Sequence, residues 1–200
     1  PKIAATVPAI VECFYLGQET GHAVADILFG DIIPSCKLPI SIPRSAGHLP
    51  AFYNHKPSAR RGYLFDDASP HFPFGYGLSY TVFEISNVRV RDPEIAIDGT
   101  TTVLADVTNT GQRSGTETIQ LYIRDLVSSV TRPVKELKGF CKVALAPGET
   151  KTVELPITHE ALAFWRIDKS FGVEAGDFEL MVGTSSRDQD LTRVNLRVTD

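Results

Sequence analysis

The stretch VLADVTNTG, residues 103–111, carries the two signals that decide the fold. Val103, Ala105 and Val107 alternate with their neighbours, so that every second side chain faces the same side of a strand. Asn109-Thr-Gly111 then supplies a turn. Repeated short strands without intervening helices predict an antiparallel β-sandwich of the immunoglobulin or fibronectin type III kind. The alternation recurs in four more segments, 119–123, 153–157, 178–182 and 194–198.

Turn residues and cysteine spacing refine this prediction. Pro147 suits the second position of a type II turn, and Gly148 suits the third position, where a positive φ is required. The strands lack the Cys, Trp, Cys spacing of immunoglobulin domains, which favours the fibronectin type III-like variant. We therefore predict a mostly β protein in which residues 83–200 form a fibronectin type III-like sandwich.

The first third of the chain has a different pattern. An apolar, β-favouring run at residues 8–15 predicts a buried strand, and apolar residues at helical spacing over 23–28 predict a helix that ends at Gly30. A lone βα unit cannot bury both faces of its strand. Residues 1–45 are therefore predicted to be the end of an α/β domain whose remaining strands lie upstream.

Prolines replace the periodic signals between Asp31 and Ser79, where there are seven of them. A segment of this length cannot be a free loop in a compact protein, so we predict an ordered strap on other surfaces, with a short strand at 38–42. Residues 46–82 are assigned to it as a linker. Within it, the aromatic residues of FPFGYGLSYTVF, residues 72–83, are predicted to be buried between the α/β domain and the sandwich. Gly75 and Gly77 are predicted to let the backbone pass close to a neighbouring segment.

Composition excludes several functions. A net charge of -4 gives no footprint for nucleic acid or an anionic membrane surface. No apolar run approaches the roughly 18 residues that a spanning helix needs. Cys13, Cys36 and Cys141 are too scattered to predict a disulfide framework or a zinc site, and we expect three buried or half-buried thiols. No cofactor or metal is expected, and periplasmic or secreted location is favoured only slightly over the cytoplasm.

Four residues are candidates for sugar contacts. Glu19 lies at the carboxyl end of the predicted strand, where ligands of open α/β sheets bind, although it also suits a first helical turn. Tyr53, His55 and Arg60 combine a ring, an imidazole and a cation, which together suit stacking on sugar C–H faces and bonding to hydroxyls. The alternative is that these residues fasten the strap to a neighbouring domain. No two carboxylates pair in sequence as an acid and a nucleophile.

A series of motifs occurs along the chain in the order GQETG (17–21), ADILFGD (25–31), PSCKLP (34–39), PRS (43–45), YNHK (53–56), PFGYGLSY (73–80), VTNTG (107–111), RPVKELKGF (132–140) and LAPGE (145–149). This colinear series closely resembles the C-terminal part of glycoside hydrolase family three, the β-glucosidases and β-xylosidases. The resemblance implies a TIM-like barrel, an α/β sandwich domain and often a fibronectin type III-like domain, so residues 1–45 would be the remnant of the second. It implies a nucleophilic Asp in the barrel and an acid/base Glu upstream, so no catalytic residue is expected here.

The resemblance implies a retaining, exo-acting β-glycosidase that hydrolyses terminal β-linked sugars in carbohydrate catabolism, with this chain inactive on its own. Expected partners are a β-linked oligosaccharide or aryl glycoside and the upstream barrel and α/β domains, and a homodimer stays open. The alternative is a stand-alone carbohydrate-binding module or a module that braces domains or a dimer. Binding would need exposed aromatic rings, whereas the apolar context of Trp165 predicts a core position.

Overall fold

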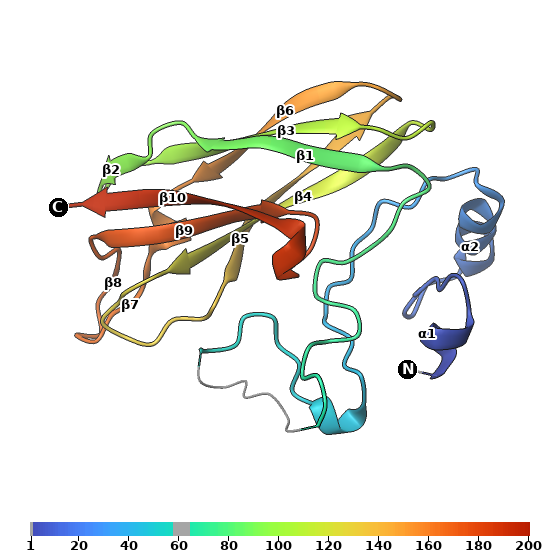
Figure 1. The fold of residues 1–200 in the computed structure, drawn as a ribbon, viewed down its shortest axis with the longest axis horizontal. Coiled ribbons are helices and arrows are strands. Elements are labelled where there is room, and N and C mark those ends of the chain that lie inside the picture. Colours follow the sequence, from blue (N-terminus) through green and yellow to red (C-terminus); the bar gives the residue numbers. More distant parts are fainter. Residues whose placement is uncertain (1, 58–64) are drawn as a thin grey trace.

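The computed structural model describes residues 2–57 and 65–200, which form a β-sandwich, a strap and a small helical part, residues 2–32, that contains two of the helices (Figure 1). The helical elements are α1 (Lys2–Thr6), α2 (Thr20–Phe29), α3 (His159–Leu162) and the 3-10 turns η1 (Ala46–His48) and η2 (Asp188–Asp190). The strands are β1 (Phe83–Val90), β2 (Glu94–Ala96), β3 (Thr101–Asn109), β4 (Gly115–Asp125), β5 (Glu136–Leu145), β6 (Thr150–Ile157), β7 (Phe164–Trp165), β8 (Phe171–Gly172), β9 (Gly176–Gly183) and β10 (Leu191–Thr199). The prediction of a mostly β chain is confirmed.

Two sheets face each other across the sandwich. One has the strand order β1-β3-β6, the other has the order β2-β10-β9-β4-β5, and β7 and β8 form a separate hairpin. Neighbouring strands run antiparallel, with the exception of the three-residue β2, which pairs parallel to β10. The predicted sandwich is therefore confirmed, with one short parallel pair added at an edge.

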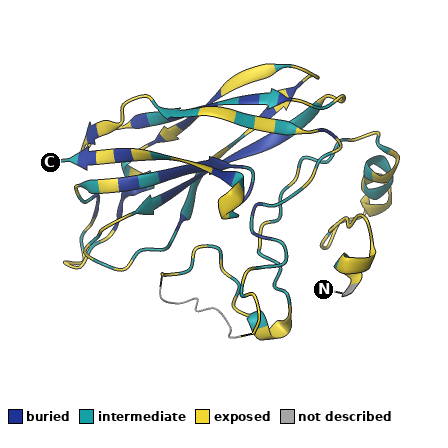
Figure 2. Ribbon diagram, viewed as in Figure 1, coloured by how far each residue is buried: buried dark blue, intermediate teal, exposed yellow. Residues whose placement is uncertain are grey.

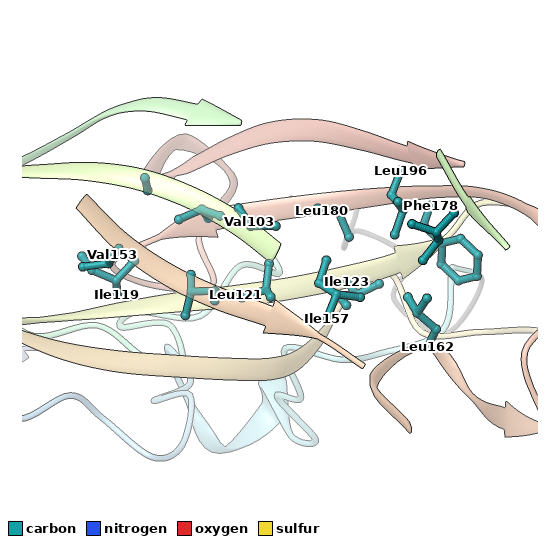
Figure 3. Packing of buried hydrophobic residues seen from close by; sticks show 14 of the residues in the cluster. Val103, Ile119, Leu121, Ile123, Val153, Ile157, Leu162, Phe178, Leu180 and Leu196 are labelled. Atoms are coloured by element: carbon teal, nitrogen blue, oxygen red, sulfur yellow. The ribbon is translucent and has the colours of Figure 1, made fainter. Parts of the chain in front are cut away.

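The core lies between the sheets, where the alternating residues meet (Figure 3). Val103, Ala105 and Val107 of β3 are fully buried, and the residues that alternate with them in the same strand are half-buried. Leu121 of β4 and Leu180 of β9 face them from the second sheet and are also fully buried. Burying a Val or Leu side chain completely stabilises the fold by about 1.5–3 kcal/mol, so this alternation supplies the sandwich with its own stability.

Strand β4 is buried on both faces, because the strap covers its outer side. Gln120 and Tyr122 point outward and are nevertheless 3% and 0% exposed. The Gln120 side-chain amide donates hydrogen bonds to the carbonyl oxygens of Gly75, at 3.0 Å, and Thr184, at 2.7 Å. Its oxygen accepts a hydrogen bond from the Tyr122 hydroxyl at 2.5 Å. These buried polar groups are satisfied by one another and by the strap, as burial requires.

The strap consists of two legs, residues 33–42 and 71–80, which run side by side (Figure 1). The amide of Leu38 donates to the carbonyl of Tyr76 at 2.9 Å, and the amide of Ile42 donates to that of Phe72 at 2.8 Å. The strand predicted at 38–42 is thus reduced to a single bridge at Ile42. Each leg supplies the other's backbone partners, and so the strap stays ordered without a sheet.

The two glycines of the strap permit close contact, as predicted. Gly75 has a φ of +77°, and a Cβ there would lie 2.1 Å from Gln120 Oε1. A Cβ on Gly77 would lie 2.5 Å from the carbonyl oxygen of Cys36. Larger residues do not fit at either position, so Gly75 lets the strap approach β4 closely and Gly77 lets the two legs of the strap approach each other.

The N-terminal part confirms the predicted helix but not the predicted strand. Helix α2 ends at Gly30, whose φ of +82° is the left-handed cap conformation. Residues 8–15 form no strand. A strand needs a neighbour to accept its hydrogen bonds, and the described residues offer none at this place. None of the described helices is long and apolar enough to cross a membrane.

Two further expectations are wrong. Trp165 is 67% exposed rather than in the core, because its neighbour Phe164 takes the inward position and successive residues of a strand point to opposite faces. Cys36 is exposed, whereas Cys13 and Cys141 are partly buried as expected. All three thiols are free.

Candidate functional site

Tyr53 fastens the strap to the sandwich. Its ring stacks on Phe74, with centroids 4.2 Å apart and planes 15° from parallel, and meets the edge of Tyr122 at 5.8 Å. Its hydroxyl accepts a hydrogen bond from the backbone amide of Leu137 on β5 at 3.2 Å. The ring therefore has a packing role of the kind that the alternative to sugar binding predicts.

His55 lies two residues further along and is anchored through its backbone. Its carbonyl oxygen accepts a hydrogen bond from the amide of Val134 at 2.9 Å, and its Nδ1 lies 3.0 Å from the carbonyl oxygen of Lys56. Because Nδ1 can donate only to that carbonyl, Nε2 is the nitrogen left to meet a ligand. The imidazole lines a cavity that Tyr53 also lines.

Glu19 lies elsewhere in the structure. It is the N-cap residue of α2, but its side chain makes no capping hydrogen bond. Its Oε2 lies 2.7 Å from Nδ1 of His22, and the Glu19 side chain is 77% exposed. It does not line the cavity beside Tyr53 and His55. Arg60 lies outside the described residues.

The cavity between the strap and the five-stranded sheet has a volume of about 760 Å³. Its walls come from segments far apart in sequence: the two legs and tip of the strap, β4, β9, the start of β10 and the segments before β5 and around η2. Residues with polar or charged side chains predominate, and five cations face two carboxylates. Lining residues are Ser41, Arg44, Tyr53, His55, Ala68, Ser69, Pro70, His71, Pro73, Arg124, Val134, Lys135, Glu179, Met181, Ser186, Arg187, Asp188, Gln189 and Arg193.

Ion pairs organise one wall of this cavity. Nζ of Lys135, a residue only 7% exposed, lies 2.6 Å from Oδ1 of Asp188 and donates to the carbonyl of Ser186 at 2.9 Å. Arg193 bonds the same Asp188 oxygen at 2.8 Å and approaches Glu179 at 3.4 Å. Burial alone would raise the pKa of Asp188, but the hydrogen bond and charge of Lys135 and the charge of Arg193 outweigh it and lower the pKa. The lowered pKa keeps the Asp188 carboxyl ionised, which does not suit a general acid.

Two nitrogen-bearing side chains of the wall keep hydrogen-bonding capacity. Among the described residues, Arg124 on β4 has no ion pair or side-chain hydrogen bond, and Nε2 of His71 is buried without a partner. Guanidinium and imidazole groups donate hydrogen bonds to hydroxyl and carboxylate oxygens. The cavity is thus equipped to bind a polar ligand, and the described residues contain no cluster of three or more metal-ligand side chains.

Sequence reasoning found Tyr53 and His55 because they are neighbours in a short motif. It missed Arg124, Lys135, Asp188 and Arg193, which meet only after the sheet has formed. One signal was available: three successive outward positions of β4, Thr118, Gln120 and Tyr122, carry no charge, which is unusual for a strand face left open to water.

Two family models match the chain. The Glycosyl hydrolase family 3 C-terminal domain matches residues 2–80, and the Fibronectin type III-like domain matches residues 117–186. A helical unit and strap followed by a fibronectin type III-like sandwich thus define the C-terminal modules of a multidomain glycosyl hydrolase. The chain belongs to glycoside hydrolase family 3, of which it represents the C-terminal part.

Individual relatives agree with this assignment. A periplasmic beta-glucosidase of Salmonella typhimurium is 47% identical over 89% of this chain and 25% of its own length. A beta-xylosidase of Formosa agariphila is 44% identical over 98% of this chain and 28% of its own length. The structure of the beta-glucosidase from Listeria innocua in complex with glucose superposes with a TM-score of 0.91 at 35% identity, over 100% of this chain and 29% of that one. The chain spans about a quarter of the length of these relatives.

Proposed function

We propose that this chain is the C-terminal portion of a retaining, exo-acting β-glycosidase that hydrolyses terminal β-linked sugars in carbohydrate catabolism. One observation carries the proposal: relatives at 44–47% identity along 89–98% of the chain bear the names beta-glucosidase and beta-xylosidase. Retention requires two carboxyl groups about 5 Å apart. The pKa of Asp188 at the cavity wall is lowered, which does not suit the general acid of such a pair and supports placing the pair outside this chain.

The test uses two polypeptides, the full-length enzyme and the 200-residue chain. We expect the full-length enzyme to release aryl alcohol from an aryl β-glucoside or β-xyloside, with the β-anomer of the sugar as the first product by NMR. The isolated chain should show no turnover. First release of the α-anomer, or turnover by the pure chain that a point substitution within it abolishes, would contradict the proposal.

We also propose that the upstream barrel and α/β domains cover the helical part. The support is a set of exposed apolar side chains on residues 10–29, among them Tyr15 and Phe29, which are 105% and 84% exposed. Such patches mark interaction surfaces.

The domain limits 1–45, 46–82 and 83–200 and a homodimeric assembly are retained as proposals. Light scattering of the full-length enzyme with and without residues 83–200 measures the mass in solution and so tests the homodimeric assembly.

Substrate contacts by Glu19, Tyr53, His55 and Arg60 are the finer part of the proposal. The strongest support is that Tyr53 and His55 line one cavity, and that the hydrogen bond of the His55 ring is made by Nδ1. In the full-length enzyme, His55→Ala should raise KM for an aryl β-glucoside about 3- to 10-fold, the value of one hydrogen bond, and change kcat less than twofold. His159→Ala, a partly buried histidine outside the cavity, is the control. Equal effects of both substitutions would argue against a sugar contact at His55.

A further inference from the structure

The hairpin β7–β8 presents two aromatic rings to solvent. Trp165 is 67% exposed and Phe171 is 51% exposed, and their ring centroids lie 5.5 Å apart with planes inclined by 60°. The hairpin lies at the end of the sandwich opposite helices α1 and α2 (Figure 1). None of the residues that line the strap cavity comes from it. The two rings therefore form a corner-shaped surface separate from the cavity.

The base of the hairpin is fixed in the core. Phe164 and Val173, which flank the exposed rings in sequence, are 6% and 2% exposed. The guanidinium of Arg132 lies over the Phe164 ring, 4.2 Å from its centroid. Rotation of β7 would tear these contacts apart, so the outward direction of Trp165 is set by the inward packing of its neighbour.

The tip of the hairpin is fixed by its turn. The amide of Arg166 donates to the carbonyl of Ser170 at 2.9 Å. Oδ1 of Asp168 accepts hydrogen bonds from the amide of Ser170 at 2.9 Å and from its hydroxyl at 2.6 Å. A ligand that binds to pre-ordered rings does not have to bear the cost of ordering them, which is about 0.5–1.5 kcal/mol for each side chain.

We propose that Trp165 and Phe171 form an accessory binding surface for β-linked oligosaccharides. The face of an aromatic ring carries negative charge density, which attracts the C–H groups on the face of a pyranose. A sugar ring lying flat on the indole has its edge against Phe171. Arg166, Asp168 and Lys169 lie between the two rings in the sequence and carry groups that form hydrogen bonds with sugar hydroxyls.

The size of the surface favours a sugar over a second protein. A fully exposed aromatic side chain offers about 150–250 Å², so two partly exposed rings offer far less than the roughly 800 Å² that each partner contributes to a stable protein interface. A single pyranose, in contrast, matches the area of one ring. The choice of β-linked sugars rests on the proposed function, whereas the aromatic surface itself does not.

The experiment is affinity electrophoresis of the 200-residue chain in gels that contain hydroxyethyl cellulose, soluble xylan, soluble starch or no polysaccharide. We expect the β-linked polymers, but not starch, to retard the chain at least twofold. Trp165→Ala and Phe171→Ala should abolish the retardation. Phe140→Ala is the matched control, because Phe140 is 64% exposed on β5, outside the hairpin, and it should migrate like the unchanged chain. Thermal melting shows that each variant is folded.

A second measurement uses the chain's single tryptophan as its own reporter. Cellohexaose and xylohexaose should each change Trp165 fluorescence in a saturable way, and Phe171→Ala should weaken the apparent affinity at least fivefold. Absence of both retardation and fluorescence change overturns the proposal and leaves the hydrolytic function, which is assayed separately, untouched. Self-association of the chain that Trp165→Ala removes, without any response to sugars, also overturns it in favour of a second copy as occupant.

Discussion

Residues 83–200 and residues 3–32 differ in where their apolar side chains go. In the sandwich, alternate strand residues turn inward and two sheets bury them together, whereas no residue between 3 and 32 is buried (Figure 2). Both regions are rich in apolar residues. An apolar pattern therefore stabilises the fold only where a second layer of secondary structure covers it. The apolar side chains of residues 3–32 need a covering surface that these residues do not themselves provide.

The largest expected effect tests this contrast directly. Leu121→Ala removes a fully buried side chain from the core and should lower the free energy of unfolding by about 2–5 kcal/mol. Leu28 of α2 is 62% exposed, so Leu28→Ala should change the free energy of unfolding by less than about 0.5 kcal/mol. Urea denaturation of the 200-residue chain measures both. A comparable loss in the two variants would mean that the helical part is as tightly packed as the sandwich.

The next effect concerns the strap, which lies between the two regions. Gly75→Ala places a Cβ 2.1 Å from Gln120 Oε1 at a φ of +77°, and should destabilise the chain by about 2–4 kcal/mol through both clash and backbone strain. Gly148→Ala is the matched control, since its φ is +76° but no atom lies within 4 Å of a new Cβ. It should cost only the strain, about 1 kcal/mol. Equal losses would show that the strap is not held against β4.

A smaller effect is expected at the hairpin end of the sandwich. Burial, the main cause, raises the pKa of Asp125 from an ordinary 3.8 to about 6; the charge of Arg132 lowers it and that of Glu174 raises it. Between these two pKa values the folded chain holds a proton that the unfolded chain has released. Stability is therefore lost as the pH rises from about 4 to about 6.

Asp125→Asn removes this titration. We expect the variant to gain about 1 kcal/mol relative to the unchanged chain between pH 4 and pH 7, a value reduced to allow for the partial exposure of Asp125. Urea midpoints at the two pH values give the difference. A gap between the two proteins that stays constant with pH would place the pKa of Asp125 near its ordinary value.

The smallest effect tests the turn of the aromatic hairpin. Lys169 has a φ of +66°, a conformation that costs a side-chain-bearing residue energy and glycine almost none. Lys169→Gly should therefore stabilise the chain by about 0.5 kcal/mol. Lys142→Gly, in the extended β5, should destabilise it by a similar amount, so thermal melting should shift in opposite directions.

The fold was predictable where the chain repeats one simple rule. The alternation of Val103 to Val107 and its four recurrences indicated the core strands, and Gly30 and Gly148 indicated a helix end and a turn, all of which the structure confirms. Residues 8–15 have the composition of a strand but no neighbour among the described residues, and composition cannot supply one. Trp165 was misplaced because apolar context does not reveal which way a two-residue strand faces.

The cavity was predictable only in part. Tyr53 and His55 are two residues apart, so a local motif revealed them together. Lys135 and Asp188 are 53 residues apart and meet only in the folded chain, whereas Arg193 is five residues from Asp188 and is brought to Glu179 by the pairing of β9 and β10. Their sequence neighbours carry no sign of this meeting, because ion pairs of this kind depend on register rather than on local pattern.

The bridge between Ile42 and Phe72 closes residues 43–71 into a loop whose two ends are fixed side by side on the sandwich. The entropy of closing such a loop grows only slowly, by about 0.6 kcal/mol for each doubling of its length. Changes in the length of this loop, outside the contacts that Tyr53 and His55 make with the sandwich, therefore cost the sandwich little stability. This loop, which contributes residues to the cavity, can therefore vary in length and alter ligand preference while the sandwich keeps its structure.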